Sequence, residues 1–484
     1  MPALERHLTK ALKSREERAI KRRLPDPVPT EDRTPSTDQI SPRAPLDFSS
    51  NDYLSLSTSA DLRASFIREC QRAPLVLGSG GSRLLSNPPA HAALEARLGT
   101  FFNTAAGADG SLLFNSGYDA NVGFFSCVPQ PGDCVVVDEH IHASVHDGVR
   151  ASRVKDSFIT FSHNDLQALE EKLDSLLQQK EKLRTGEASM FVAVESLYSM
   201  DGTFAPLKQV VDLLGHMFPA GNAYLIVDEA HATGVYGPQG RGMLAAYGLE
   251  RHPCVLARLH TFGKALASTG AVLLTTPLVR SYLVNYARPL IYTTALSHPN
   301  IIATGCAFDL LEDGTAEALS VRLLDLSQYM IDLLRQRLRN VPMNVLSLPP
   351  HLSSAPHSSP GGPTPISSGM AVYASNPPPP IIPLMTPHPR PLATFLLTRC
   401  NIVARPITWP TVPRGAGRVR ICLRSGHTRM DVERLVEGCV AWASSFQTSK
   451  QDAAYDAALS MHSHHDTNHT VAVAVRDHTR SAKL

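Results

Sequence analysis

Between residues 112 and 275, short aliphatic runs alternate with segments of helical periodicity, and this alternation restricts the possible folds more than any other feature of the chain. The runs lie at 112–114, 134–137, 191–194, 224–227, 255–262 and 271–275. Each run is continuous, which is typical of strands that helices cover on both faces. Helices are predicted at 90–103, 163–184 and 206–217. The pattern therefore predicts an α/β fold with a mainly parallel sheet.

The composition changes along the chain and divides it into four parts. Residues 1–45 are predicted to form a basic amphipathic helix, over 3–23, and a Pro-rich linker. Residues 46–299 contain the predicted sheet, and residues 300–446 are predicted to form a smaller α+β domain. Its helices are expected at 300–313, 316–339 and 430–446, and its strands at 381–385, 401–404 and 418–422. The Ser-, Pro- and Gly-rich residues 348–380 indicate a flexible insertion, and the polar residues 447–484 a disordered tail.

Composition and charge argue against several classes of function. The net charge is +2, so we expect neither nucleic acid nor a charged membrane surface as a partner. No apolar run approaches the roughly 20 residues that span a bilayer. The eight cysteines include no Cys-x-x-Cys pair, so no metal site and no disulfide framework is expected. The N-terminus lacks the apolar stretch of a secretory signal, and Glu5, Glu16 and Glu17 argue against a mitochondrial leader.

Lys264 follows the predicted strand 255–262 and lies among small, neutral residues. Partial desolvation lowers the pKa of such an amine and makes it nucleophilic, as in lysines that form Schiff bases with carbonyl substrates or with pyridoxal phosphate (PLP). Taken alone, Gly263-Lys264 is more often an ordinary surface pair. Asp228, which follows the run 224–227, favours the Schiff-base interpretation instead. A buried carboxylate there needs a cation, and a pyridinium nitrogen is one; capping of a helix would explain Asp228 but not the nearby His231.

Further polar residues follow other predicted strands or begin helices. Gly117 and Tyr118 stand at a helix N-terminus, where backbone N–H groups can bind a phosphate, and the Thr261 hydroxyl can add a donor. His142 begins its own helix, and stacking on a cofactor and a purely structural helix-entry role are equally compatible with the local sequence. Ser199 follows a strand end and is also compatible with a simple turn.

Seven motifs occur in a fixed order along the chain. They are Ser-Asn-Asp-Tyr-Leu at 50–54, Gly-Ser-Gly-Gly-Ser at 78–82, His-Ala-Ser at 142–144, Ser-Met-Asp-Gly at 199–202, Asp-Glu-Ala-His-Ala-Thr-Gly at 228–234, Thr-Phe-Gly-Lys at 261–264 and Pro-Thr-Val-Pro at 410–413. With them, residues 51–428 resemble the PLP-dependent α-oxoamine synthases. The resemblance implies the fold-type I architecture of aspartate aminotransferase, with a seven-stranded large domain and a small α+β domain. It also implies a homodimer with active sites at the subunit interface.

The resemblance assigns roles to individual residues. Lys264 resembles the Schiff-base lysine, Asp228 the partner of the pyridine nitrogen, and His142 the residue that stacks on the ring. The remaining cofactor-binding positions are implied to be Gly117, Tyr118, Ser199, His231, Thr261, Thr293 and Thr294, of which the last two reach the neighbouring subunit. The implied substrate-binding positions are Lys21, Asn51, Arg405 and Thr411, and Arg405 resembles the arginine that holds the amino-acid carboxylate.

The family joins an amino acid to an acyl-CoA, with loss of CoA and carbon dioxide. We favour L-alanine and pimeloyl-CoA, a pair used in biotin synthesis, and other acyl-CoA and amino-acid pairs stay open. A non-catalytic subunit is disfavoured because Lys264 is intact. The C-terminal Ala482-Lys483-Leu484 resembles a Ser-Lys-Leu peroxisomal address, so we expect recognition by an import receptor and a peroxisomal location, with the cytoplasm as the alternative.

Overall fold

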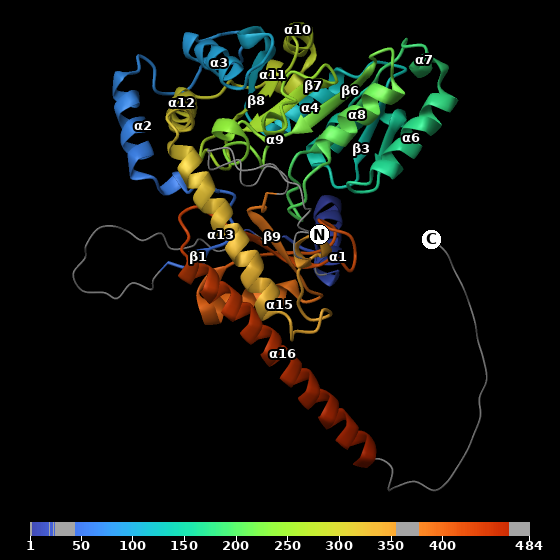
Figure 1. The fold of residues 1–484 in the computed structure, drawn as a ribbon, viewed down its shortest axis with the longest axis vertical. Coiled ribbons are helices and arrows are strands. Elements are labelled where there is room, and N and C mark those ends of the chain that lie inside the picture. The colour runs from blue at the N-terminus through green and yellow to red at the C-terminus, as the bar shows by residue number, and fades with distance from the viewer. Residues whose placement is uncertain (1, 19, 23, 25–43, 355–376, 464–484) are drawn as a thin grey trace, which may run out of the picture.

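The computed structural model describes residues 2–18, 20–22, 24, 44–354 and 377–463. The larger unit of the molecule is a seven-stranded sheet with helices on both faces, and a smaller α+β unit lies below it in Figure 1. Helix α13 (Thr315–Arg337) runs between the two, and α16 (Arg429–Ser463) extends away from the small unit. The predicted α/β architecture with a small α+β domain is confirmed.

The large sheet has the strand order β2-β8-β7-β6-β5-β3-β4. Its strands are β2 Ser111–Phe114, β3 Cys134–Asp138, β4 Phe158–Phe161, β5 Met190–Glu195, β6 Ala223–Asp228, β7 Val255–Thr261 and β8 Ala271–Leu274. Strand β8 pairs antiparallel with β2 and β7, and every other pair in this sheet is parallel. The prediction of a mainly parallel sheet is therefore confirmed.

The continuous aliphatic strands fill two cores, one on each face of the sheet. In β3, Val136 belongs to one buried cluster, whereas Val135 and Val137 belong to the other. Because neighbouring side chains of a strand point to opposite faces, both faces must be apolar when helices cover both. Among the covering helices, α4 (Gly117–Cys127) packs on β7 and β8, and α8 (Leu207–Met217) packs on β6.

The small unit is built on the antiparallel sheet β11-β12-β9. Its strands are β9 Ile381–Met385, β11 Arg405–Ile407 and β12 Arg418–Cys422, and α15 (Pro389–Cys400) and α16 pack against each other beside it. A two-stranded parallel pair joins β1 (Leu46–Asp47) to β10 (Ile402–Val403). This pairing brings the segment that follows the N-terminal region onto the small unit.

Two predicted helices end earlier than the sequence indicated. Helix α1 covers Ala3–Glu17 rather than 3–23, since the chain turns after Arg18 and places Ile20 in a buried position. The predicted helix 163–184 is two helices, α6 (Leu166–Gln179) and α7 (Glu181–Arg184), separated by the extended backbone of Lys180. Lys180 stands where the apolar stripe of α6 would place its next residue, so the helix gains no burial by continuing.

Two predictions of flexibility also need correction. The predicted insertion 348–380 is packed at both ends: Leu352 is buried in α14 (Pro350–Ser353), and Pro377–Pro380 are buried between the two units. There the Pro378 carbonyl accepts a hydrogen bond from Tyr236 and the Pro379 carbonyl accepts one from Ser327. Helix α16 continues to Ser463, beyond the predicted end at 446. Most of the predicted linker 26–45 and the C-terminal tripeptide lie outside the described residues.

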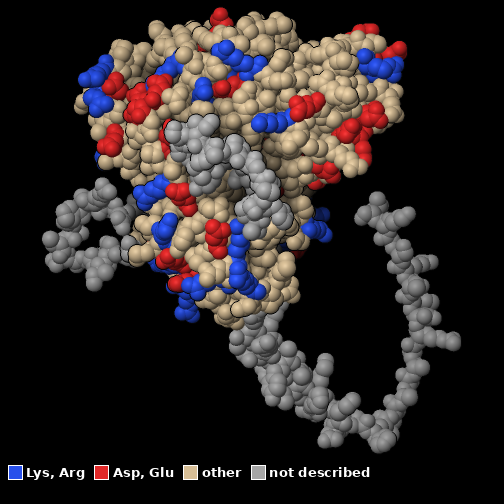
Figure 2. Space-filling model, in the orientation of Figure 1, with Lys and Arg blue, Asp and Glu red and all other residues tan. Residues whose placement is uncertain are grey.

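The surface and the helices of the described residues add two observations. On the face shown in Figure 2, basic and acidic side chains are interspersed over both units. In the part of the chain that the structure describes, none of the helices is both long and apolar enough to span a bilayer.

Candidate active site

A cavity of about 440 Å³ lies at the carboxyl ends of β5, β6 and β7. Parallel sheets bind ligands at this edge because loops and helix N-termini converge there. Seven of the predicted site residues line the cavity together: Gly117, Tyr118, His142, Asp228, His231, Thr261 and Lys264. Residues from four separate regions of the sequence therefore meet at one place.

Lys264 stands just after β7 and lines this cavity. Burial lowers the pKa of its amine, while the nearby charges of Asp228 and Glu195 act in the opposite direction. The net direction is down, so a larger share of the amine is free at neutral pH than for a lysine in water. A free amine in a dry pocket is the form that attacks a carbonyl carbon.

Asp228 ends β6 and is held by neutral donors. Its Oδ2 accepts a hydrogen bond of 3.0 Å from Asn121 Nδ2, and its Oδ1 accepts one of 2.9 Å from the Ala230 backbone N–H. Asn121 comes from α4 and also donates to the Ser144 hydroxyl. The carboxylate is 8% exposed, so its orientation is fixed and its charge is available to a cationic group in the cavity.

Glu195 is a second carboxyl in the same cavity, and the sequence argument did not select it. It lies opposite Asp228 in the pairing of β5 with β6. Burial, and then the charge of Asp228, raise the pKa of Glu195 well above its usual value. The neutral form of Glu195 is thereby favoured, which limits the negative charge around Lys264. Its place at the end of a strand, as for Asp228, was the signal that could have identified it.

His231 is buried and connected to the Ser-Asn-Asp-Tyr-Leu motif. The Tyr53 hydroxyl lies 2.6 Å from His231 Nδ1. Burial, together with the charges of Lys264 and Arg420, holds the pKa of His231 well below its usual range, so the ring is neutral. Burial also raises the pKa of Tyr53 well above its usual value. We therefore infer that Tyr53 donates to Nδ1, which places the ring proton on Nε2.

The same motif connects the cavity to the small unit. Arg420 Nη2, on β12, donates a hydrogen bond of 2.9 Å to Asn51 Oδ1. Asn51 Oδ1 is also 3.4 Å from the Tyr53 hydroxyl. Asn51 does not line the cavity itself, and its contacts make it a bridge between β12 and the residues around His231.

The N-terminus of α4 fits a phosphate group. Ser116 caps the helix by accepting a hydrogen bond from the Asp119 N–H. A side chain at Gly117 would meet the Thr261 methyl group at 2.5 Å, so only glycine permits this close approach of α4 to β7. Asn115, before the helix, donates to the Thr294 carbonyl at 2.7 Å. Backbone N–H groups at such a terminus bind phosphate without a cationic side chain.

His142 caps α5 (Ala143–Arg150) and faces the cavity. Its Nδ1 lies 2.7 Å from the Ser144 hydroxyl, and burial lowers the pKa of its ring. The Tyr118 ring meets it edge-to-face, and the Tyr118 hydroxyl donates to Asp147 at 2.6 Å. A neutral, oriented imidazole at this place can stack on a planar cofactor and donate or accept a proton.

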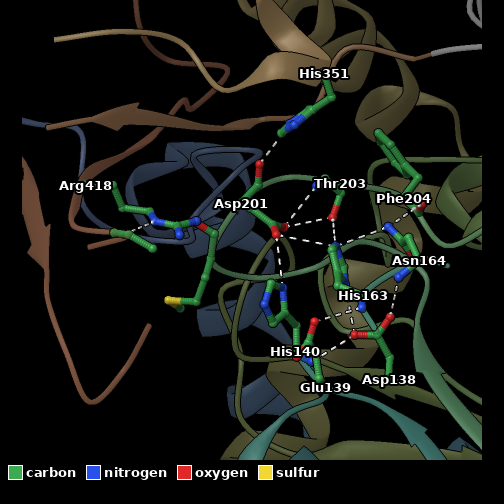
Figure 3. A network of polar contacts seen from close by, with 12 residues as sticks. Asp138, Glu139, His140, His163, Asn164, Asp201, Thr203, Phe204, His351 and Arg418 are labelled. Carbon is green, nitrogen blue, oxygen red and sulfur yellow. Dashed lines mark hydrogen bonds and ion pairs between the residues drawn. The ribbon is translucent and has the colours of Figure 1, made fainter. Parts of the chain in front are cut away.

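A polar network fixes the loop that carries Ser199, although Ser199 itself does not line the cavity. Figure 3 shows its centre, Asp201, which lies 3.3 Å from His140 Nδ1 and accepts a 2.8 Å hydrogen bond from the Thr203 hydroxyl. Burial raises the pKa of Asp201, but the His140 hydrogen bond, the charge of His163 and the bonds from Thr203 outweigh burial and lower the pKa to about 2.

The network also reaches the small unit. His351 Nε2 lies 3.1 Å from the Asp201 carbonyl, and Arg418 donates to the Met200 carbonyl. Asp138, His140 and His163 have the spacing of metal ligands in the described part of the chain. However, His163 uses both ring nitrogens within the network, facing Asp138 at 2.9 Å and Thr203 at 2.7 Å. These contacts account for the cluster without an ion.

The remaining predicted site residues do not line the cavity. Lys21 forms an exposed ion pair of 3.1 Å with Glu16, and Arg405 is exposed on β11. Thr411 donates its backbone N–H to the Thr408 carbonyl. In the same loop, the guanidinium groups of Arg18 and Arg414 both lie over the Trp409 ring. The Thr293 hydroxyl is 3.3 Å from Asn115 Nδ2.

The donor set of the cavity fits PLP. It offers an amine for the aldehyde, a fixed carboxylate for the pyridine nitrogen, a neutral imidazole with a free ring nitrogen for the hydroxyl, and a helix N-terminus for the phosphate. The residues in these positions are Lys264, Asp228, His231 and Gly117. Each group comes from a different element, and each would be costly to bury without a partner.

Known proteins match the chain over most of its length. Residues 43–438 match the family Aminotransferase class I and II. An 8-amino-7-oxononanoate synthase of Emericella nidulans is 40% identical over 92% of this chain and 97% of its own length. The aminoacyl transferase sphA of Aspergillus fumigatus is 36% identical over 81% of this chain and 79% of its own. A solved serine palmitoyltransferase of Sphingomonas wittichii has the same fold, with a TM-score of 0.70 and 22% identity over 93% of this chain and 100% of its own.

Proposed function

Because the chain belongs to the α-oxoamine synthase family, PLP-dependent acyltransferases of the class I and II aminotransferase fold, we propose that it condenses L-alanine with pimeloyl-CoA. The products are 8-amino-7-oxononanoate, CoA and carbon dioxide, and the pathway served is biotin synthesis. Family membership supports the general reaction, the condensation of an amino acid with an acyl-CoA. The identity of the two substrates, L-alanine and pimeloyl-CoA, is the specific part of this proposal.

One observation supports this chemistry: the half-buried Lys264 amine and the Asp228 carboxylate, which Asn121 and the Ala230 N–H hold in place, line the same cavity. Pyridoxal phosphate supplies an electron-withdrawing ring that delocalises the charge left when the Cα–H bond of the amino acid breaks. With the cofactor bound, Asp228 would hold the ring nitrogen in its protonated form through a charge-assisted hydrogen bond. The neutral His231, positioned by Tyr53, would donate to the ring hydroxyl.

Lys264 has a second role after the amino acid has bound. Its lowered pKa leaves the amine free to accept the Cα proton, and that proton is later returned to the product. We assign to His142, the N-cap of α5, the donation of a proton or a hydrogen bond to the thioester oxygen of the acyl-CoA. We assign the amino-acid carboxylate to Arg405, which is exposed on β11 in the single chain.

The similarity to the relative named 8-amino-7-oxononanoate synthase supports the choice of pimeloyl-CoA and alanine. The two sequences are 40% identical over 92% of this chain and 97% of the relative. The 36% identity to an aminoacyl transferase named sphA supports the alternative, a condensing enzyme for another acyl-CoA or amino acid. 5-Aminolevulinate synthase and 2-amino-3-oxobutyrate CoA ligase activities belong to the same alternative.

We also propose that the chain acts as a homodimer. Leu77 and Leu85, on either side of the glycine-rich segment 78–83, are 78% and 84% exposed, and Tyr292 is 72% exposed. Leu75, Val76 and Leu84, in the same segment, are exposed as well, and apolar side chains that gather in one exposed segment are typical of a surface that a partner covers. Tyr292 precedes Thr293 and Thr294, which we assign to the phosphate of the neighbouring subunit's site.

The peroxisome is the location that we propose, through recognition of Ala482-Lys483-Leu484 by an import receptor. A fluorescent protein that carries the last residues of the chain, with and without Leu484, tests this proposal. Punctate fluorescence that coincides with a peroxisomal marker and depends on Leu484 supports it. Diffuse fluorescence from both fusions contradicts it and favours the cytoplasm.

The experiment for the function is a release assay for free CoA thiol. Purified enzyme with PLP is mixed with L-alanine and pimeloyl-CoA, and in parallel with glycine or serine and with acetyl-, succinyl- or palmitoyl-CoA. We expect release to be fastest with alanine and pimeloyl-CoA, and 8-amino-7-oxononanoate to be the product by mass. The Lys264→Ala variant is the negative control. Faster release with another pair would replace the proposed substrates, and no release with any pair would contradict the family activity in this chain.

A further inference from the structure

Four side chains form a continuous series of hydrogen bonds beside the active-site cavity, from Asp228 through Asn121 and Ser144 to His142. Asn121 Nδ2, on α4, lies 3.0 Å from Asp228 Oδ2 and also 3.0 Å from the Ser144 hydroxyl oxygen. The Ser144 hydroxyl, on α5, lies 2.7 Å from His142 Nδ1. Asn121 is 3% exposed and Ser144 is fully buried, so water does not compete for these hydrogen bonds.

The carboxylate of Asp228 determines how the Asn121 amide is oriented. An ionised carboxylate only accepts hydrogen bonds, and Oδ1 of Asp228 already accepts one from the Ala230 N–H. If the Asn121 amide were turned around, its oxygen would face Oδ2 and two acceptors would be in contact. The amide nitrogen therefore faces Asp228, and its two N–H groups donate to Asp228 and to Ser144.

This orientation in turn determines where the Ser144 hydroxyl donates. A hydroxyl has one hydrogen and an amide nitrogen does not accept, so the Ser144 hydrogen points to His142 Nδ1 and not to Asn121. The backbone N–H of Ser144 donates to the same nitrogen at 3.3 Å. Nδ1 thus accepts from two donors and cannot carry a hydrogen itself, which leaves a neutral ring with its hydrogen on Nε2. Burial acts in the same direction, because it lowers the pKa of His142.

The Nε2 edge of the ring is the one available to a ligand. The His142 side chain is exposed and lines the cavity, and no residue of the described part of the chain forms a hydrogen bond with its Nε2. The Tyr118 ring packs edge-to-face against the imidazole, with 6.4 Å between the ring centroids. Turning the imidazole over would break both hydrogen bonds to Nδ1 at once, so the Nε2–H has a fixed direction.

We propose that Asn121 and Ser144 are positioning residues that connect the negative charge of Asp228 to His142 and hold the His142 hydrogen on Nε2. His142 then offers the cavity a hydrogen-bond donor and does not accept a proton there. The recipient, the thioester oxygen of the acyl-CoA, rests on the proposed function, whereas the position of the hydrogen does not. Asp228 thereby acts on two groups, the cofactor nitrogen directly and His142 through two buried side chains.

Solid-state NMR of the PLP-loaded enzyme, labelled with ¹⁵N in its histidines, measures the position of this hydrogen. The chain has 20 histidines, so the His142 signals are identified by their absence from a His142→Phe variant. In the wild type at neutral pH we expect a neutral imidazole, with Nδ1 unprotonated and Nε2 protonated.

Ser144→Ala removes one of the two donors to Nδ1. A hydrogen bond of ordinary net strength changes such an equilibrium about fivefold, so the ratio of the Nε2–H form to the Nδ1–H form should fall by about that factor. Ser144→Cys keeps the volume of the side chain but is a weak donor, and it should resemble Ser144→Ala. Ser126→Ala is the matched control, because the Ser126 hydroxyl on α4 donates to the Gly123 carbonyl and its loss should leave the ratio unchanged.

Asp228→Asn tests the other end of the series, with PLP in excess. The new amide offers N–H groups where the carboxylate accepted, so Asn121 should turn its oxygen toward position 228 and toward Ser144. Ser144 then donates to Asn121 and accepts from His142 Nδ1, and the Nδ1–H form should increase. In a Ser144→Ala background the same substitution should have little effect, because the series is already interrupted.

Four results would overturn the proposal. They are an Nδ1–H or doubly protonated His142 in the wild type, a ratio that Ser144→Ala leaves unchanged, a Ser144→Cys variant that matches the wild type, and a ratio that Asp228→Asn leaves unchanged. The NMR measurement needs no substrate, so it decides the proposal whatever the enzyme condenses.

The CoA-release assay separates this proposal from the proposed function. Ser144→Ala should lower kcat several-fold with a nearly unchanged KM for the amino acid, and an unchanged kcat would contradict a role of the Nε2 hydrogen in the reaction. A wild-type enzyme that releases no CoA with any pair of substrates contradicts the proposed function alone, because the position of the hydrogen is measured without them.

Discussion

Replacement of Asp201 by asparagine tests the polar network that holds the 199–203 loop against the small unit. The substitution keeps the size of the side chain and removes its charge. In the folded protein the pKa of Asp201 is lowered from 3.8 to about 2, with His140, His163 and Thr203 as the partners that outweigh burial. This difference corresponds to about 2.5 kcal/mol of stabilisation at neutral pH. We expect Asp201→Asn to lose most of it, or about 2 kcal/mol.

The pH dependence follows from the two groups that face each other in this network. The Asp201 contribution is fully present above about pH 4 and is lost as the pH falls toward about 2, because the folded pKa is the lower one. The pKa of His140 is raised, chiefly by its hydrogen bond to Asp201. Its contribution is therefore present below its unfolded pKa of 6.5 and is lost as the pH rises through the raised value. The difference between wild type and variant should be largest between these limits.

The assay is urea unfolding followed by circular dichroism, at one protein concentration and several pH values. Asp212→Asn, an exposed site on α8, is the control and should leave the unfolding midpoint unchanged. We expect a lower midpoint for Asp201→Asn at pH 5.5 and a smaller difference above about pH 8. If Asp201→Asn matches the wild type at every pH, the network does not stabilise the fold and our account of Figure 3 is wrong.

Three further substitutions test individual contacts. Tyr53→Phe removes the hydroxyl 2.6 Å from His231 Nδ1. We expect a loss of about 1 kcal/mol in unfolding free energy and a several-fold lower kcat, because the imidazole tautomer is no longer fixed. An unchanged kcat would refute the role of Tyr53 in orienting His231. Gly117→Ala places a methyl group 2.5 Å from the Thr261 methyl; absorbance titration should show PLP affinity reduced by at least about tenfold with the fold intact, whereas wild-type affinity would contradict the phosphate assignment. Glu195→Gln replaces a carboxyl whose pKa is raised well above 4.5 by burial and by Asp228. A raised pKa makes the wild-type fold less stable as the pH rises above the unfolded pKa of the carboxyl, so the unfolding free energy of the variant should be at least that of wild type at pH 7 and should depend less on pH between about 5 and 7. A marked loss of stability in the variant would show that Glu195 is charged.

The sequence alone was sufficient for the parts of the fold that depend on strong periodicity. The continuous run at 224–227 predicts a strand covered on both faces, and β6 is such a strand, ending at Asp228. Lys264 was selected because small, neutral neighbours partly desolvate its amine, and Asp228 because a carboxylate at the end of a buried strand needs a cation. The family resemblance assigned His231, and the structure brings all three to one cavity.

The elements that sequence reasoning missed depend on long-range contacts. Pro377–Pro380 resemble a flexible segment in composition, yet their carbonyls accept hydrogen bonds from Tyr236 and Ser327, which are far away in sequence. Glu195 stands at a strand end four residues before the motif at 199–202 but belongs to no motif itself, and its proximity to Asp228 depends on the pairing of β5 with β6. The contact of Arg420 with Asn51 joins positions 369 residues apart, and no local pattern predicts such a pair.

The most direct test of the central claim is to locate the covalent link between the protein and its cofactor. The PLP-loaded enzyme is reduced with borohydride, digested and examined by mass spectrometry. The account predicts a pyridoxyl group on Lys264, and a Lys264→Ala variant that carries none and has no CoA-release activity. A label on a different lysine, or a Lys264→Ala variant that retains the wild-type visible absorbance and activity, would contradict it.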